Sequence, residues 1–221
     1  MVSATALTPI PESISFEHAA IVPDAVTTPW EAITNTAKVR PGEAVGIWGA
    51  GGLGLHAVQL LAICGAAPIV VVDPNETARG RALQVGADMA IDPRDPDFDQ
   101  RIAAVTGDHG LDVALDFAGV PDVRRQSLRN LTHGGRLVLV GISGGPLTIE
   151  DDVDFLFRQL TIVGHYGGAK ESVPTLLRLI EMGRLDLSQS VTATLPLAEA
   201  QQAMIQLRDK IGNPVRIVLL P

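Results

Sequence analysis

The stretch AVGIWGAGGLGLHAVQLLAICGA, from Ala44 to Ala66, decides the fold. It predicts a buried strand, a glycine-rich turn and an apolar helix in direct succession. In that context a GxGxxG pattern indicates nucleotide binding. Gly49, Gly51 and Gly54 occupy the three glycine positions. In that pattern the first glycine permits the tight turn, the second lets a pyrophosphate approach the backbone, and the third lets helix and sheet pack closely. The stretch therefore predicts a dinucleotide-binding loop, with a ligand-free strand-to-helix turn as the alternative.

A second apolar run, IVVVD, ends at Asp73, nineteen residues beyond Gly54. A carboxylate at that position can accept hydrogen bonds from the adenosine ribose hydroxyls, and its charge would repel a 2′-phosphate. The sequence therefore favours NAD over NADP. Arg79 and Arg81 follow on the next predicted helix, where we expect them to be solvated, and they leave NADP possible. Asp73 could instead serve only as a strand-end cap.

Four more strand patterns follow, each separated from the next by a helical one. They are MAID, GLDVALDFAG, GGRLVLVGIS and LTIVGHYGG. Six strands alternating with helices predict an α/β fold of the Rossmann type, a doubly wound parallel sheet with its ligand at the carboxyl ends of the strands. The helix after Asp73 should turn Ala82 and Leu83 toward the sheet, and the acidic run from Asp92 to Gln100 should be a solvated loop before a helix from Arg101.

The two ends of the chain lie outside this pattern. Ser15 is a candidate helix cap, and Pro23 and Pro29 should divide the segment that follows into separate helical pieces. The last fifty residues predict a helix, a strand, a helix and a strand that the six-stranded sheet does not need. We therefore expect a dinucleotide-binding domain over residues 26–166, flanked by remnants of a second domain at 1–25 and 167–221.

Composition excludes several classes of function. A net charge of −8 argues against nucleic acid or an anionic membrane surface as partner. The single cysteine, Cys64, excludes an internal disulfide and an all-cysteine zinc cluster, and we expect it to be a packed core thiol. No apolar run approaches the roughly 20 residues that span a bilayer. The first residues, MVSATALTPIPE, lack the features of a signal peptide, so we expect a cytoplasmic location.

Taken together, these motifs resemble the medium-chain dehydrogenase/reductase superfamily, specifically the zinc-type alcohol dehydrogenases. The segments that carry the resemblance are IPESISFEHAAIVPDAVTTPWEAI, VRPGEAVGIWGAGGLGLHAVQLL, the VVVD run, GGRLVLVGIS, LTIVGHYGGAK and GNPVRIVLLP. They cover nearly the whole chain in unbroken order. The resemblance implies the cofactor-binding domain and C-terminal segment of such an enzyme.

The same resemblance implies that a domain is missing. In the family an N-terminal GroES-like catalytic domain supplies two zinc ligands and the proton relay, and none of its motifs occurs here. The family's third zinc ligand matches Asp24 in DAVTTPW. One carboxylate does not hold zinc, so we expect no metal site in this chain unless Asp24 is joined by ligands supplied in trans.

The resemblance also assigns residues to the cofactor. The matched positions are Gly49, Gly51, Gly52, Leu53, Gly54, Asp73, Gly119, Val120, Val140, Gly141, Ile142 and Arg216. The last of these matches an arginine that reaches the pyrophosphate, although an edge-strand surface arginine is an equal alternative. Asp24, Thr28, His165 and Tyr166 match segments beside the nicotinamide and the substrate, where a side chain could act as acid or base. The family uses the segment of His165 and Tyr166 mainly through its backbone. His56, on the helix after the loop, should be packed or partly exposed rather than functional.

Three functions remain open. The first is an NAD-dependent, alcohol dehydrogenase-like oxidoreductase for a small-molecule substrate, shortened and without a complete zinc site, whose catalytic domain could be a separate polypeptide. The second is a shortened relative with zinc-independent chemistry in the open cleft. The third is a non-catalytic dinucleotide-binding protein. In each case the sixth strand, LTIVGHY, would be a sheet edge that needs covering, and the resemblance implies a homodimer through it.

Overall fold

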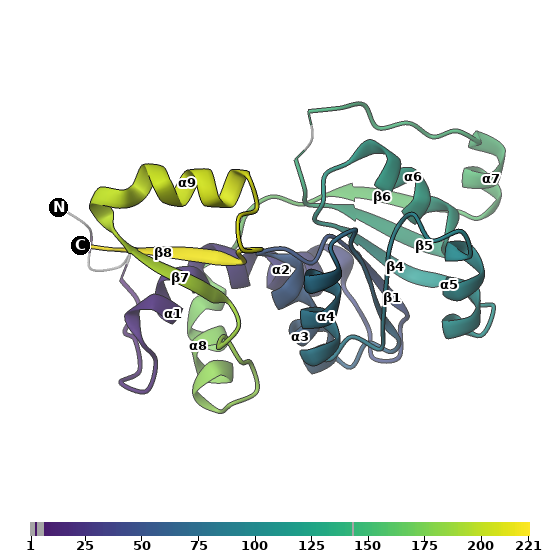
Figure 1. Cartoon of the computed structure of the whole chain (residues 1–221). Helices are drawn as coiled ribbons and strands as arrows, with labels where there is room; N and C mark the ends of the chain where they lie inside the picture. The colour runs from purple at the N-terminus through teal and green to yellow at the C-terminus, as the bar shows by residue number, and fades with distance from the viewer. Residues whose placement is uncertain (1–2, 4–6, 143) are drawn as a thin grey trace. The chain divides into compact units, whose positions relative to one another are not determined.

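The computed structural model describes residue 3 and residues 7–142 and 144–221 (Figure 1). The chain folds as two compact units. One is continuous in sequence, Pro29–Tyr166, and the other combines Met1–Thr28 with Gly167–Pro221. Among the described residues, no helix has both the length and the apolar character needed to cross a bilayer.

The unit Pro29–Tyr166 is built on a six-stranded parallel sheet in the order β3-β2-β1-β4-β5-β6. The strands are β1 (Val45–Trp48), β2 (Ile69–Val72), β3 (Met89–Ile91), β4 (Leu111–Asp116), β5 (Leu131–Leu139) and β6 (Thr161–Gly164). The predicted doubly wound sheet is therefore confirmed. The chain runs outward from β1 to β3 and then returns to β4 on the other side of β1, so the topological switch lies between β1 and β4. In open sheets of this kind ligands bind at that switch, beyond the carboxyl ends of the strands.

Five helices connect these strands: α3 (Gly54–Cys64), α4 (Glu76–Gln84), α5 (Phe98–Thr106), α6 (Pro121–Arg129) and α7 (Asp152–Phe157). Side-chain caps start two of them, because Asn75 accepts a hydrogen bond from the backbone of Ala78 and Asp151 accepts one from Asp154. Helix α5 begins at Phe98 rather than at Arg101 as predicted, since the buried Phe98 ring anchors its first turn.

Leu83 of α4 does not face the sheet. Its side chain is 50% exposed, whereas the preceding Ala82 is fully buried. The prediction that both residues point inward was therefore wrong for Leu83. The small side chain of Ala82 lets α4 lie close to the sheet.

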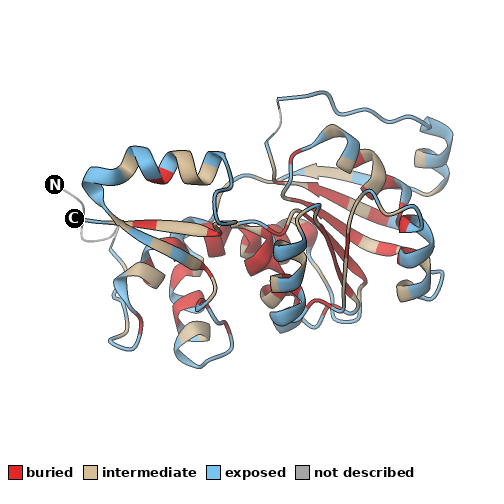
Figure 2. Cartoon of the chain, viewed as in Figure 1, coloured by how far each residue is buried: buried red, intermediate tan, exposed pale blue. Residues whose placement is uncertain are grey.

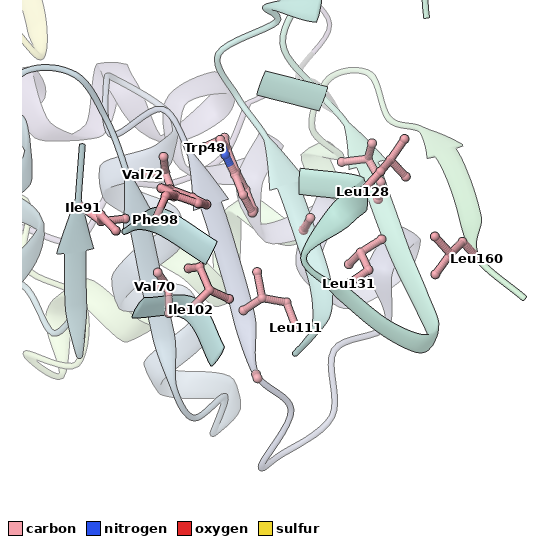
Figure 3. Packing of buried hydrophobic residues seen from close by; sticks show 13 residues of the cluster. Trp48, Val70, Val72, Ile91, Phe98, Ile102, Leu111, Leu128, Leu131 and Leu160 are labelled. Atoms are coloured by element: carbon pink, nitrogen blue, oxygen red, sulfur yellow. The ribbon is translucent and has the colours of Figure 1, made fainter. Parts of the chain in front are cut away.

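The hydrophobic core of this unit lies on both faces of the sheet, and the strands are its most deeply buried part (Figure 2). On one face, strand residues pack against α5 and α6 (Figure 3). That cluster includes Trp48, Val70, Val72, Ile91, Phe98, Ile102, Leu111, Leu128, Leu131 and Leu160. The alternate strand residues, such as Ile47 and Val71, are also fully buried and point to the opposite face. Parallel strands covered on both faces account for the continuous apolar runs in the sequence.

The segment Phe16–Ala37 is helical throughout, as α1 (Phe16–Ile21), η2 (Val22–Val26), α2 (Thr27–Glu31) and η3 (Ala32–Ala37), where η2 and η3 are π-helical. Ser15 caps it as predicted, by accepting from the backbone N–H of His18. Pro23 and Pro29 do not interrupt it, contrary to prediction. Pro23 lies in the first turn of η2 and Pro29 is the third residue of α2, so each lies close to a change between α-helical and π-helical hydrogen bonding.

The other unit contains α1 and η2 together with α8 (Val173–Glu181), β7 (Val191–Pro196), α9 (Ala200–Arg208) and β8 (Arg216–Leu220). Short 3₁₀ turns at Lys170–Ser172 and Leu197–Glu199 precede α8 and α9. Strands β7 and β8 pair in parallel, and α9 packs on both of them (Figure 1). Helix α8 contacts η2, and α1 contacts β8, so the two ends of the chain meet in this unit.

Candidate functional site

The glycine loop joins β1 to α3 at the carboxyl edge of the sheet. Gly49 has a φ of +96°, a conformation that suits glycine alone, and its N–H donates to the carbonyl of Val72. A Cβ atom added to Gly54 would lie 1.8 Å from the Gly49 carbonyl oxygen. A Cβ added to Gly51 would meet no atom within 4 Å. The fold itself therefore demands glycine at 49 and 54, whereas at 51 the space beside the backbone is open.

Asp73 is tied to this loop through its side chain. Its Oδ2 accepts a hydrogen bond from the N–H of Ala50 at 2.8 Å, and its Oδ1 accepts one from the N–H of Asn75 at 2.8 Å. Each carboxylate oxygen has a second lone pair that can accept another hydrogen bond. The strand-end cap and the ribose acceptor are therefore compatible roles. The capping contacts hold the half-buried carboxylate beside the loop.

Arg79 is not solvated, which corrects the prediction for that residue. Its Nη1 donates to the main-chain carbonyl of Asp73 at 2.7 Å and lies 3.4 Å from Oδ2 of Asp92, and its side chain is only 20% exposed. Asp92 also pairs with Arg94, which holds the pKa of the Asp92 carboxyl well below its ordinary value. The acidic loop is thus anchored at its start by arginines.

His56 supports the glycine loop from within the protein. The side chain is fully buried, and its Nδ1 lies 2.9 Å from the carbonyl oxygen of Gly52. This agrees with the prediction of a packed histidine. Gly52 and Leu53, which were assigned to the cofactor, form the half-buried turn between that contact and α3.

The turns that follow β4 and β5 form the other side of the site, which we call the second wall. The buried residue Asp116 contacts both turns, through its side chain and its main-chain carbonyl. Oδ1 of Asp116 accepts from the N–H of Gly119 at 2.8 Å, and its Oδ2 accepts from Nε of Arg124 at 2.8 Å. The carbonyl oxygen of Asp116 accepts from the N–H groups of Val140 and Gly141. Sequence reasoning missed Asp116 and Arg124. The available signal was a charged residue at the end of an apolar strand, which needs a partner when buried.

These two turns approach one another very closely. A Cβ on Gly119 would lie 2.8 Å from the backbone of Gly141, and one on Gly141 would lie 2.3 Å from the nitrogen of Gly119. Val140 is buried beneath them, while Val120 and Ile142 are 45% and 81% exposed. The predicted cofactor-lining residues of this wall are therefore brought together, and two of them present apolar side chains to the surface.

His165 follows β6 in the same unit. Its Nδ1 lies 2.8 Å from Oγ1 of Thr36 in η3, and its N–H donates to the carbonyl of Leu139. The adjacent Tyr166 is 90% exposed. The backbone of this segment thus continues the sheet edge, while the imidazole is oriented by a threonine hydroxyl.

Asp24, Thr28 and Arg216 come together in the other unit. Thr28 Oγ1 donates to Oδ1 of Asp24 at 3.1 Å, and Nη2 of Arg216 lies 3.9 Å from Oδ2 of Asp24. Burial lowers the pKa of Arg216, and the charge of Asp24 acts in the opposite direction. Across the described part of the chain, no three His, Cys, Asp or Glu side chains gather as a metal site would require. The donors present do not fit a catalytic zinc ion.

The sequence and the structure were both compared with those of known proteins. The zinc-binding dehydrogenase family matches residues 52–182, more than half of the chain. L-threonine 3-dehydrogenase of Pyrococcus horikoshii is 36% identical over 152 residues, which are 68% of this chain and 44% of that enzyme.

Solved structures agree over a longer span. An alcohol dehydrogenase zinc-binding domain protein from Burkholderia ambifaria superposes with a TM-score of 0.87 at 28% identity, covering 96% of this chain and 58% of that one. A solved NAD-dependent alcohol dehydrogenase superposes with a TM-score of 0.83 at 28% identity, covering 92% of this chain and 59% of that one. The chain thus spans less than two thirds of the length of each of these proteins.

Proposed function

This chain belongs to the zinc-binding dehydrogenase family, and we propose that it binds NAD(H) as the cofactor-binding part of an alcohol dehydrogenase-like oxidoreductase. The observation that carries the proposal is the tether between Asp73 and the N–H of Ala50. It fixes a ribose-binding carboxylate beside a loop whose open position, Gly51, admits a pyrophosphate.

The order of the strands supports a direction for the bound dinucleotide. If the pyrophosphate lies on the loop after β1, the ribose carboxylate of Asp73 lies at the end of β2, on one side of that loop. The turns at Gly119 and Gly141 follow β4 and β5, on the other side. An extended dinucleotide therefore has its adenosine over β2 and its nicotinamide over the second wall.

The electrostatics of the adenosine end favour NAD(H) over NADP(H). The 2′-phosphate of NADP(H) would approach the carboxylate of Asp73, and two neighbouring negative charges repel each other. Arg79, the nearby cation that could offset this repulsion, is already engaged by the Asp73 carbonyl and by Asp92. The name of the solved NAD-dependent alcohol dehydrogenase is consistent with this choice.

Bound NAD(H) would supply hydride transfer to or from a small-molecule substrate, and the chain's own residues would bind and orient it. The glycine loop holds the phosphates, Asp73 fixes the adenosine ribose, and the second wall positions the nicotinamide. The described residues do not fit zinc. Ligands for a zinc ion would have to come from outside them, including from a separate polypeptide, so no step through the metal is derived for this chain.

Titration of the chain with NADH and with NADPH tests the proposal directly, either by nicotinamide fluorescence or by calorimetry. We expect NADH to bind at least tenfold more tightly than NADPH. Binding of neither dinucleotide would overturn the proposal. Tighter binding of NADPH would contradict the role given to Asp73.

We further propose that two copies pair through β6. This strand ends the sheet, so one row of its backbone groups faces away from β5. Exposed apolar side chains on α7 precede it, and they are Val153, Leu156 and Phe157. An unprotected edge of this kind is a ready template for pairing with another strand.

A further inference from the structure

The turns after β4 and β5 are coupled by close packing as well as by the hydrogen bonds from Val140 and Gly141 to the Asp116 carbonyl. Gly119 and Gly141 are in backbone contact with no room for a Cβ on either residue. A small change in one turn must therefore displace the other, because close-packed atoms cannot interpenetrate. The two turns therefore need contacts that fix the distance between them.

Arg124 is placed to do so. Its Nε donates to Oδ2 of Asp116 at 2.8 Å, and its Nη2 donates to the carbonyl oxygen of Gly141 at 2.9 Å. The other carboxylate oxygen of Asp116 accepts from the N–H of Gly119. The guanidinium and the carboxylate thus form a buried bridge that runs from the first turn to the second, with Asp116 fully buried and Arg124 7% exposed.

We infer that Arg124 and Asp116 are positioning residues for the nicotinamide half of the cofactor. The inference rests on the proposed function, which places the nicotinamide over these two turns and the adenosine over β2. Two hydrogen bonds of the bridge end on Gly119 and Gly141, in the turns assigned to the nicotinamide. Its loss should therefore weaken binding of the nicotinamide end more than binding of the adenosine end.

The shape of the guanidinium is essential to this role. Its donors are fixed in one plane, so two of them can reach two acceptors at once, whereas a lysine ammonium is a compact charge on a flexible stem. Arg124→Lys therefore keeps a positive charge beside Asp116 but cannot hold both the carboxylate and the Gly141 carbonyl in the same geometry. Arg129→Lys is the matched control, because Arg129 is an exposed residue of the same helix.

The experiment compares the dissociation constants of NADH and ADP by calorimetry for the unmodified chain, R124K and R129K. ADP spans only the adenosine and pyrophosphate part of the site. We expect R124K to bind NADH about tenfold more weakly, a change of about 1.4 kcal/mol, while its affinity for ADP stays within about twofold. We expect R129K to match the unmodified chain for both ligands.

Other results would overturn the inference. If R124K retains NADH affinity within about twofold, the bridge does not position the nicotinamide. If NADH and ADP weaken equally, its role is only structural. Should R124K fail to fold, the neutral pair Asp116→Asn with Arg124→Gln replaces it and is judged by the same criteria. An unmodified chain that binds ADP but gains nothing from the nicotinamide of NADH would also overturn the inference, whereas one that binds neither ligand would overturn the proposed function on which it rests.

Discussion

The carbonyl oxygen of Gly49 lies where a side chain on Gly54 would have to be, 1.8 Å from an added Cβ atom. Gly54→Ala must therefore move either the loop or the start of α3, because the clash is with backbone rather than with a flexible side chain. Overpacking of this kind costs about 1–3 kcal/mol. We expect a loss near the upper end of that range in the free energy of unfolding, measured by urea denaturation. A change below about 0.5 kcal/mol would contradict the contact.

Gly51→Ala is expected to separate ligand binding from stability. An added Cβ there meets no protein atom within 4 Å, and the residue does not have a positive φ, so the fold should tolerate it. The same methyl group would stand between the backbone and a bound pyrophosphate. We expect the free energy of unfolding to change by less than about 0.5 kcal/mol, the usual range for surface substitutions, while the dissociation constant of NADH rises at least tenfold. Unchanged NADH affinity would place the phosphates elsewhere.

Asp73→Asn should reduce the preference for NADH over NADPH. The substitution removes the negative charge that repels a 2′-phosphate but keeps a side chain of similar shape. We expect the ratio of the two dissociation constants to fall by about tenfold, or 1.4 kcal/mol. Asp88→Asn is the control, since Asp88 accepts a hydrogen bond from the N–H of Ile69 at the opposite end of β2. An equal change of the ratio in both variants would contradict the assignment.

Cys64 should react slowly with alkylating reagents in the folded chain. It is a free, half-buried thiol, and burial raises its pKa, which lowers the fraction of reactive thiolate. At pH 8 we expect iodoacetamide to modify Cys64 more slowly in buffer than in urea, as followed by mass spectrometry. Equal rates would contradict the burial of the thiol.

The same shift has a consequence for stability at alkaline pH. A raised pKa in the folded state means that the contribution of the neutral thiol is complete below the unfolded pKa, about 8.5, and is lost as the pH rises through the folded value. The free energy of unfolding should therefore decrease more steeply above pH 8.5 than it does in Cys64→Ala.

Gly164→Pro tests the proposed pairing through β6. The N–H of His165 points toward Leu139 of β5, so by strand alternation the N–H of Gly164 points outward. Proline removes that outward donor, whereas Gly164→Ala retains it, and a Cβ at this position meets no atom within 4 Å. We expect light scattering to show a dimer for the unmodified chain and for G164A, and a monomer for G164P. A monomeric unmodified chain would refute the pairing.

The sheet and its glycine loop could be predicted from sequence because their signals are local. Buried parallel strands read as continuous apolar runs, and a glycine with a positive φ or a backbone in close contact tolerates no other residue. Gly49 has the positive φ, and Gly54 makes the close backbone contact. Asp73 was found in the same way, since its distance from the loop is set by one helix and one strand.

The features that sequence reasoning missed depend on tertiary register. The bridge of Arg124 joins Asp116, eight residues earlier, to Gly141, seventeen residues later, and no local pattern marks that connection. Arg79 was predicted to be solvated because it lies on the helix that follows Asp73, yet the carbonyl of Asp73 and the carboxylate of Asp92 lie within its reach. Pro23 and Pro29 are local helix-breaking signals, yet both lie inside a continuous helical segment.

The unit formed from both chain ends imposes an order on folding during synthesis. The segment from Phe16 to Val26 emerges from the ribosome before α8 and β8, the elements that it contacts. Pro29–Tyr166 can complete its sheet while that early segment still waits for its partners. Helix α1 and η2 are therefore packed only after α8 and β8 have been made, and until then their buried residues, such as Val22, are open to chaperones and proteases.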